Sequence, residues 1–299
     1  MGFCAGVQRA FDMMEKVVEK TESSVYAKHS IVHNNKVVKY FEDKNVIFKE
    51  QLSDIPQGST VMFSAHGSPM ADTEEGKANY NLYDSCCPLV SKGHRAIKKL
   101  TSEGYHIIII GNKNHVEVIG LSGQLPNSNN YTVVSNIQDV AKLEIPASQP
   151  ISYITQTTLS LDDTSEVISA LKDKFPHLLA PTKDYICYAT QNRQNAVKDV
   201  VHDIDCLLVA SSPESSNGNK LCLIGKNNGI KTFMIEDAQQ ISNLNLQKFN
   251  NIGLTAAAST PQSCIDEIVN YMKKLYNTEV LKHVHTEETE SFIMPKSLR

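Results

Sequence analysis

Short apolar runs alternate with amphipathic segments along most of this 299-residue sequence. Apolar residues at positions 7, 10, 11, 14, 17 and 18 recur with helical spacing, which predicts a helix that ends near Lys20. Apolar and β-branched runs predict strands at 25–27, 60–64, 106–110, 131–134, 151–155, 206–210, 232–235 and 252–254. Helices are expected between them, among others at 34–44, 162–175 and 261–276. This alternation predicts an α/β fold with mostly parallel sheets.

Three cysteines recur at similar intervals, each at the start of a predicted helix. They are Cys4, Cys87 and Cys187, and Pro88 after Cys87 suits the first turn of a helix. The spacing predicts three small α/β domains in a pseudo-threefold arrangement. We expect them at residues 1–87, 88–185 and 186–277, followed by a C-terminal tail at 278–299. Short apolar runs at 280–281 and 292–294 suit edge strands or a clasp.

Composition and charge narrow the class of protein. The sequence is 41% hydrophobic and 21% charged, which is ordinary for a globular chain. A formal net charge of -4 argues against nucleic acid or an anionic membrane surface as partner. The sequence contains no apolar run of the roughly 20 residues that a membrane-spanning helix needs. No signal peptide is evident either, so we expect a cytoplasmic location.

Seven cysteines without a CxxC pair point to metal binding or catalysis rather than to disulfides or a zinc ribbon. Cys4, Cys87 and Cys187 lie in turns marked by small residues or proline. The positive N-terminal end of the helix that follows each turn favours the thiolate over the thiol. Three thiolates suit an iron-sulfur cluster with one open iron, or a zinc site with a fourth ligand. Free cysteines are also common buried apolar residues, and we expect that role for Cys206, Cys222 and Cys264, whereas the role of Cys86 is open.

Polar residues at the boundaries of predicted elements form a candidate anion site. The histidines are His33, His66 and His115, and the short donors that precede helices are Ser215, Ser216, Asn217 and Ser259. Such groups hold phosphate oxygens at helix N-termini, and they also occur as plain helix caps or surface histidines. Glu117 follows His115 closely and becomes a candidate proton donor if burial raises the pKa of its carboxyl group.

The motifs resemble, in order, those of the LytB family of 4-hydroxy-3-methylbut-2-enyl diphosphate reductases. The resemblance covers essentially the whole sequence. It is carried by the segments at 2–7, 32–34, 63–67, 87–90, 115–118, 155–160, 186–190, 192–194 and 215–217.

The resemblance implies three α/β domains around a central 4Fe-4S cluster held by Cys4, Cys87 and Cys187, with one iron free for substrate. It further implies the last step of the non-mevalonate isoprenoid pathway, in which an allylic diphosphate loses its hydroxyl group and gives isopentenyl and dimethylallyl diphosphate. Glu117 would supply the proton and Thr157 would orient the hydroxyl. The diphosphate would be held by His33, His66, His115, Ser215, Ser216, Asn217 and Ser259. A flavodoxin or ferredoxin would be the external electron donor.

The sequence departs from the family pattern at several positions. Val116 replaces a proline, Ala257 replaces a glycine, and Glu214 lies in a segment that commonly reads like Gly-Ser-Lys-Asn. The family usually has a strand ahead of the first glycine, where this sequence has Met1, and we expect an added strand to improve cluster retention. The departures at Val116, Ala257 and Glu214 keep open a relative that binds a diphosphate without turnover. A further alternative is a generic, metal-free phosphate-binding α/β domain.

Overall fold

A computed structural model describes residues 1–126, 128–181 and 185–299. The chain divides into two compact units, which are described separately. The first unit comprises Met1–Gln8, Val32–Asp43 and Tyr188–Phe292, and the second comprises Arg9–Ile31, Lys44–Cys187 and Ile293–Arg299. The strands of the described residues form three small sheets in which every strand pair is parallel. The predicted α/β class with mostly parallel sheets is therefore confirmed.

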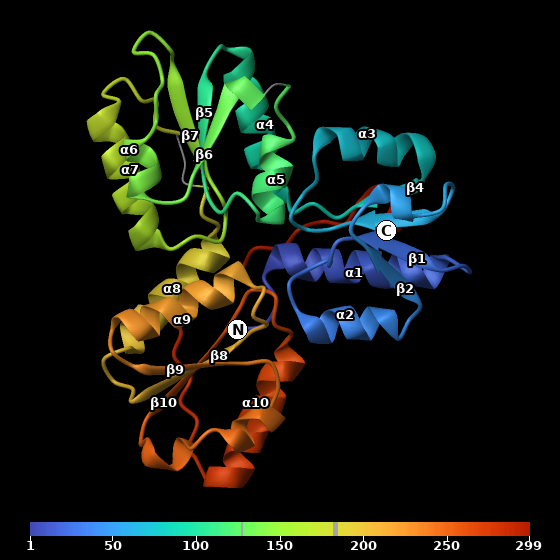
Figure 1. Cartoon of the computed structure of the whole chain (residues 1–299). Coiled ribbons are helices and arrows are strands. Elements are labelled where there is room, and N and C mark those ends of the chain that lie inside the picture. Colours follow the sequence, from blue (N-terminus) through green and yellow to red (C-terminus); the bar gives the residue numbers. More distant parts are fainter. Residues whose placement is uncertain (127, 182–184) are drawn as a thin grey trace. The chain divides into compact units, whose positions relative to one another are not determined.

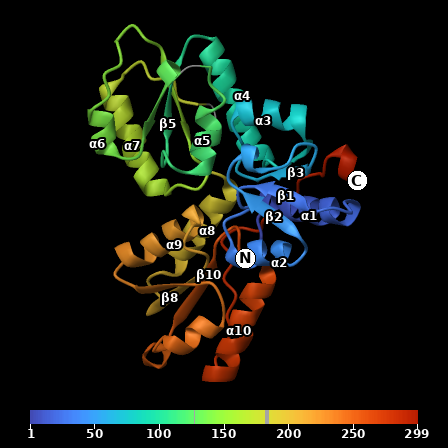
Figure 2. The same cartoon turned by 45° about the vertical axis from the view of Figure 1, so that its right-hand side comes forward.

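The sheet of order β6-β5-β7 lies in the second unit and is covered by helices on both faces (Figures 1 and 2). Its strands are β5 (His106–Ile110), β6 (Tyr131–Val134) and β7 (Ile151–Thr155), and its helices are α4 (Pro88–Ser102), α5 (Val116–Ser122), α6 (Ile137–Ala141) and α7 (Leu161–Lys174). Because successive strand residues point to opposite faces, Ile108 packs with residues of α6 and α7, whereas Ile107 packs with residues of α4 and α5. This explains why β5 reads as an unbroken apolar run.

The sheet of order β10-β8-β9 lies in the first unit and repeats this plan. It contains β8 (Cys206–Ala210), β9 (Lys231–Ile235) and β10 (Ile252–Ala256), with α8 (Tyr188–Val200), α9 (Ser216–Asn227) and α10 (Gln262–Tyr276) around it (Figure 1). Leu208 packs with residues of α10, and Leu207 packs with residues of α8 and α9. Helix α2 (Asn35–Glu42) belongs to the same unit.

The third sheet, of order β2-β1-β3-β4, lies in the second unit. Its strands are β1 (Val25–Lys28), β2 (Val46–Lys49), β3 (Thr60–Phe63) and β4 (Asn81–Asp84), and helices α1 (Ala5–Lys20) and α3 (Met70–Asn79) complete the list of α-helices. Strand β3 is buried along its whole length, whereas edge strand β4 is not. Short 3-10 helices occur at Leu52–Asp54, Ser128–Asn130, Gln239–Asn243, Leu246–Lys248 and Lys296–Leu298.

Some local expectations are wrong. The sequence pattern also predicts a polar loop over residues 111–117, but α5 begins at Val116 and includes Glu117 in its first turn, so the loop ends at His115. The edge strands predicted at 280–281 and 292–294 are not formed among the described residues of the tail. Sequence patterns also missed β2 and α3, and α3 buries Gly76 while most of its other positions are polar.

The predicted domains at 1–87, 88–185 and 186–277 stay a prediction. Within the part of the chain that the structure describes, no helix is long and apolar enough to cross a membrane.

The packing of β5 leads to a testable prediction about stability. Ile108→Ala removes a fully buried side chain from the core between β5 and α7, so we expect a loss of about 2–5 kcal/mol in the free energy of unfolding. Urea unfolding followed by circular dichroism measures this loss. Ile137→Ala, at a position 42% exposed on α6, is the matched control and should change the midpoint little. Equal shifts for the two variants would contradict the described core.

Candidate functional site

The three candidate ligand cysteines share one backbone arrangement. The N–H of Cys4 donates to the carbonyl of Ala258 at 3.1 Å, that of Cys87 to Ala65 at 3.0 Å, and that of Cys187 to Thr157 at 3.1 Å. The accepting residues lie in the loops that follow β10, β3 and β7, one in each sheet. Each cysteine immediately precedes a helix, namely α1, α4 or α8. Each turn is thus held at the carboxyl end of a parallel strand, where α/β proteins bind ligands.

The seven cysteines differ in burial. None of them is in a disulfide; Cys4, Cys86, Cys87 and Cys187 are partly exposed, whereas Cys206, Cys222 and Cys264 are buried, as predicted. Burial raises the pKa of Cys206 and of Cys222 to about 11, so both stay protonated. Burial likewise raises the pKa of Cys86 to about 12, and its sulfur accepts a hydrogen bond from Ser91 Oγ at 3.2 Å. Cys86 is therefore held as a thiol beside Cys87.

The candidate metal ligands are divided between the two units, because Cys4 belongs to the first and Cys87 and Cys187 to the second. Among the described residues, no three His, Cys, Asp or Glu side chains are grouped in a way that would hold a metal ion. The three thiols remain candidate ligands on their chemistry: none of them forms a disulfide, sulfur is a soft ligand, and each thiol lies at the start of a helix.

Glu117 and Thr157 form the central polar contact of the second unit. Both carboxylate oxygens accept hydrogen bonds from Thr157, Oε1 from the backbone N–H and Oε2 from Oγ1, each at 2.8 Å. Glu117 is 2% exposed, and this burial raises its pKa to about 7, although the two hydrogen bonds act in the opposite direction. The carboxyl group can therefore hold and release a proton near neutral pH. Thr157 also accepts the backbone N–H of Cys187 through its carbonyl.

His66 and His115 lie close together in the second unit. Their ring centroids are 5.9 Å apart and the rings meet edge to face. His115 caps α5, because its Nδ1 accepts the backbone N–H of Glu117 at 3.1 Å. An accepting Nδ1 carries no proton, so the neutral ring has its N–H at Nε2. Gly67, directly after His66, has φ +80°, a conformation that favours glycine.

In the first unit, the loops after β8 and β10 approach the start of α2. Ser215 caps α9 by accepting the N–H of Gly218 at 3.2 Å, and Ser216 is the first residue of that helix. Asn217 Oδ1 accepts the N–H of Ala258 at 3.0 Å, and Ser259 Oγ donates to the carbonyl of His33 at 2.9 Å. The predicted residues therefore lie in connected loops, in the case of His33, Ser215 and Ser259, and in the first turn of α9, in the case of Ser216 and Asn217.

Asn217 provides a specific indication of a ligand in the first unit. It is 3% exposed, and its Nδ2 is buried without a hydrogen-bond partner among the described atoms. A buried amide donor that lacks a partner costs free energy unless a ligand or water accepts from it. Together with the N-terminus of α9, it suits an anion.

The three departures from the family pattern are accommodated locally. Val116 is the first residue of α5, the position where a proline is otherwise favoured in helices. Ala257 is fully buried, and its methyl group lies 3.6 Å from where a Cβ at Gly218 would be. Glu214 is exposed. The added methyl group therefore lies in the protein interior, and the carboxylate is in contact with solvent.

Sequence patterns missed two residues near Cys4. Tyr188 Oη accepts the N–H of Ala5 at 3.3 Å, and Arg193 Nη2 donates to the carbonyl of Gly2 at 2.9 Å. A signal was present for Arg193, because it lies four residues from both Ala189 and Val197 and so shares their buried helix face.

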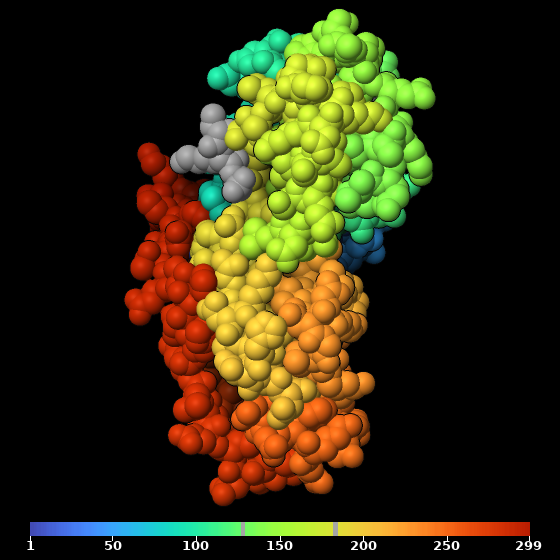
Figure 3. Space-filling view, turned by 90° about the vertical axis from the view of Figure 1, so that its left-hand side faces the viewer, coloured from blue at the N-terminus to red at the C-terminus, as the bar shows by residue number. Residues whose placement is uncertain are grey.

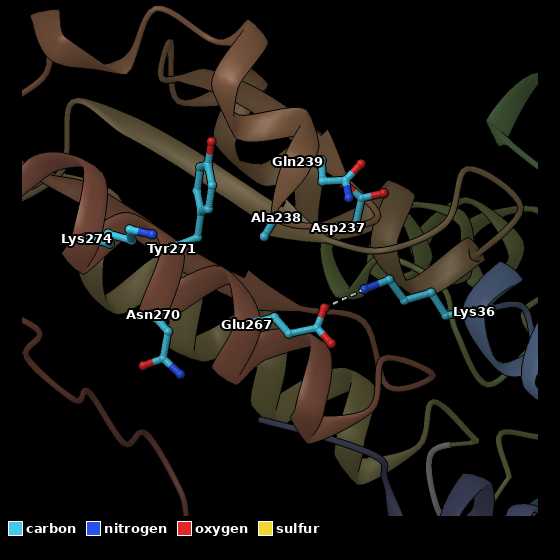
Figure 4. Close-up of a pocket in the computed structure, with 8 residues that line it drawn as sticks. All are labelled: Lys36, Asp237, Ala238, Gln239, Glu267, Asn270, Tyr271 and Lys274. Carbon is cyan, nitrogen blue, oxygen red and sulfur yellow. Dashed lines mark hydrogen bonds and ion pairs between the residues drawn. The ribbon is translucent and has the colours of Figure 1, made fainter.

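A separate pocket in the first unit lies between α2, α10 and the segment after β9 (Figure 4). It is lined by Lys36, Asp237, Ala238, Gln239, Glu267, Asn270, Tyr271 and Lys274. Lys36 Nζ and Glu267 Oε2 form an ion pair of 2.7 Å across it. These lining residues include none of the predicted site residues, so the pocket is not the candidate site.

The raised pKa of Glu117 can be tested directly. A carboxyl group whose pKa is raised favours the folded state at low pH, and this contribution is lost as the pH rises from about 4.5 through about 7. Infrared spectroscopy should therefore show a protonated carboxyl band that disappears around pH 7 and is absent in Glu117→Gln. Glu214→Gln, at an exposed position, should leave the band in place. Titration of the band near pH 4.5 would contradict the described burial.

Comparison with known proteins identifies the family. The family model described as LytB protein matches residues 1–273. A 4-hydroxy-3-methylbut-2-enyl diphosphate reductase from Acidithiobacillus ferrooxidans is 42% identical over 298 residues, which covers 99% of this chain and 94% of the relative. The enzyme of the same name from Ruthia magnifica is 41% identical and covers 100% of this chain and 97% of the relative.

Solved structures agree with these matches. The structure of the E-1-hydroxy-2-methyl-but-2-enyl-4-diphosphate reductase from Plasmodium falciparum matches with a TM-score of 0.94 and 36% identity, over 99% of this chain and 94% of the other. The structure of an (E)-4-hydroxy-3-methyl-but-2-enyl diphosphate reductase, described as the terminal enzyme of the non-mevalonate pathway, matches with a TM-score of 0.66 and 28% identity. Because the family model matches residues 1–273 of the 299 in this chain, the chain belongs to the LytB family.

Proposed function

We propose that this protein reduces 4-hydroxy-3-methylbut-2-enyl diphosphate to isopentenyl and dimethylallyl diphosphate, the last step of the non-mevalonate pathway. Relatives that carry this enzyme name match over essentially the whole chain, which supports an oxidoreductase of this type. Among the contacts in the site, one supports the reaction most directly. Thr157 binds the buried carboxyl group of Glu117 with its N–H and Oγ1 and holds the turn of Cys187 with its carbonyl.

The proposed cofactor is a 4Fe-4S cluster ligated by Cys4, Cys87 and Cys187. The donor set fits such a cluster, because the three thiols are partly exposed and none of them is in a disulfide, whereas the neighbouring Cys86 has a raised pKa and accepts a hydrogen bond from Ser91. When bound, a cluster with one iron free of protein ligands supplies Lewis acidity and electrons. The backbone N–H of each ligating cysteine is already used within the protein, so each turn has a fixed position before any ligand binds.

Glu117 is the proposed source of the proton in this reaction. Its pKa near 7 keeps a fraction of the carboxyl group protonated at neutral pH, which suits a general acid. Thr157 lies within hydrogen-bond distance of both carboxylate oxygens and would orient the substrate hydroxyl and the acid together. The burial of Glu117 also keeps bulk water away from the proton.

The diphosphate is proposed to bind to His33, His66, His115, Ser215, Ser216, Asn217 and Ser259. The buried Nδ2 of Asn217 and the N-terminus of α9 offer donors for its oxygens in the first unit. In the second unit, the Nε2–H of neutral His115 would donate a hydrogen bond to a phosphate oxygen. Electrons would come from an external flavodoxin or ferredoxin, and we propose a cytoplasmic location without nucleic-acid or membrane partners.

The ligand assignment predicts the outcome of cluster reconstitution. Anaerobically reconstituted protein should be coloured and carry iron and sulfide. Cys4→Ser, Cys87→Ser and Cys187→Ser should each lose most of both, because a hydroxyl group replaces a thiolate ligand. Cys86→Ser is the matched control and should keep its iron, because the pKa of Cys86 is raised to about 12 and its sulfur is already hydrogen-bonded to Ser91. A colourless wild-type protein without iron or sulfide would refute the assignment and favour the metal-free alternative.

An assay of substrate turnover distinguishes the reductase from a relative that only binds a diphosphate. Reduced viologen should be oxidised when substrate is added to the wild-type protein. Glu117→Gln should slow this oxidation by roughly 10²–10⁴-fold, because the general acid is lost, while iron content stays unchanged. Glu214→Gln, at an exposed position, should turn over normally. Diphosphate binding without any substrate-dependent oxidation in the wild type would favour the alternative.

A further inference from the structure

The turn that carries Cys4 is held from α8 on both sides of the cysteine. On one side Arg193 Nη2 donates to the carbonyl of Gly2 at 2.9 Å, and on the other Tyr188 Oη accepts the N–H of Ala5 at 3.3 Å. Gly2 has φ +94°, and a Cβ there would approach the side chain of Gln262 to 3.0 Å. The backbone of this turn therefore depends on contacts with side chains far away in the sequence.

The guanidinium group of Arg193 needs a counter-charge where it lies. The side chain is 7% exposed, and Nη1 also donates to the carbonyl of Ala189 in the same helix. A buried cation is costly unless it is paired and hydrogen-bonded. Glu288 supplies the carboxylate, with Oε1 at 3.2 Å from Nη1. Arg193 thus joins Glu288 to the carbonyl of Gly2.

Glu288 belongs to residues 277–295, the tail segment between α10 and the last 3-10 helix, which forms neither helix nor strand. This tail segment, drawn in red, runs beside the yellow residues of α8 in Figure 3. It is tied to α8 at a second point, because His283 Nε2 and His285 Nδ1 lie 2.8 and 2.7 Å from Asp199 Oδ2. Asn192 Nδ2 also donates to Glu288 Oε1 at 3.3 Å. The tail therefore lies against α8 through specific polar contacts.

We propose that Glu288 is a positioning residue which, through Arg193, fixes the Gly2–Cys4 turn and so determines how firmly Cys4 holds its ligand. The tail segment then acts as a clasp on the amino-terminal turn. This inference rests on the proposed role of Cys4 as a cluster ligand. Its structural part, the restraint of the turn by Glu288, holds without any cluster.

Amide hydrogen exchange on the full-length protein without cluster tests that structural part. In Glu288→Gln the amides of Cys4 and Ala5 should exchange about tenfold faster. The reason is that the charge-assisted hydrogen bond between Arg193 and Glu288, which holds Arg193 against the turn, is lost. Glu287→Gln removes the same charge from the neighbouring exposed residue and should exchange like the wild type. Amides in the last turn of α8 should be unchanged in both variants, which separates loosening of the turn from general destabilisation.

A second variant tests whether Glu288 acts through Arg193. Arg193→Lys keeps the positive charge but lacks the forked guanidinium that reaches Gly2 and Glu288 together. Exchange should be faster in Arg193→Lys alone, and adding Glu288→Gln should accelerate it little further. Full additivity of the two effects would overturn the proposed path. Equal exchange in Glu288→Gln and Glu287→Gln would overturn the clasp itself.

The link to the ligand is tested by iron retention. Reconstituted Glu288→Gln should lose iron to a chelator several-fold faster than Glu287→Gln. Faster exchange combined with unchanged iron loss would overturn the link to Cys4 while leaving the clasp in place. If the wild type takes up no iron at all, the proposed function fails, and the exchange experiment still decides whether the tail restrains the turn.

Discussion

The backbone hydrogen bond of each candidate ligand cysteine is the interaction on which the rest of the site depends. Cys4, Cys87 and Cys187 each donate their N–H to a carbonyl in the loop after a parallel strand. β3 and β7 are buried along their whole length and β10 is buried at its carboxyl end, so the loop that follows each strand starts from a packed position. The thiols are therefore positioned by main-chain geometry, and the side chains need only adopt a rotamer.

This arrangement places other site residues beside the cysteines. Ala65 precedes His66, Ala258 precedes Ser259, and Thr157 is itself a site residue, so the loop that holds each cysteine also carries a polar side chain of the candidate site. Where Thr157 is concerned, one residue contributes its N–H, its hydroxyl group and its carbonyl to three separate hydrogen bonds. Substitution of Thr157 would therefore alter the contacts of the Glu117 carboxyl group and of the Cys187 turn together.

Local patterns in the sequence predicted the buried strands and the turns at Cys87 and Cys187 well. A run such as Ile107–Ile110 has few alternatives to a buried strand, and Pro88 marks the start of its helix. Helix α3 was missed because it buries little besides Gly76 and so lacks an apolar stripe.

Contacts between distant parts of the chain could not be read from any local pattern. The hydrogen bond from Cys4 to Ala258 joins residues that are far apart in the sequence, and so does the hydrogen bond from Arg193 to Gly2. The pKa of Glu117 likewise depends on complete burial, which follows from the packing of α5 and not from the residues beside it.

The cap that His115 provides for α5 has a consequence for the kind of anion contact this ring can make. Because Nδ1 is committed to the N–H of Glu117, protonation of the ring there would place two donors face to face and open the first turn of the helix. The imidazole is thereby restricted to a single tautomer. Its Nε2–H is the donor of a neutral ring, and a neutral donor binds an anion less tightly than a group with a full positive charge would.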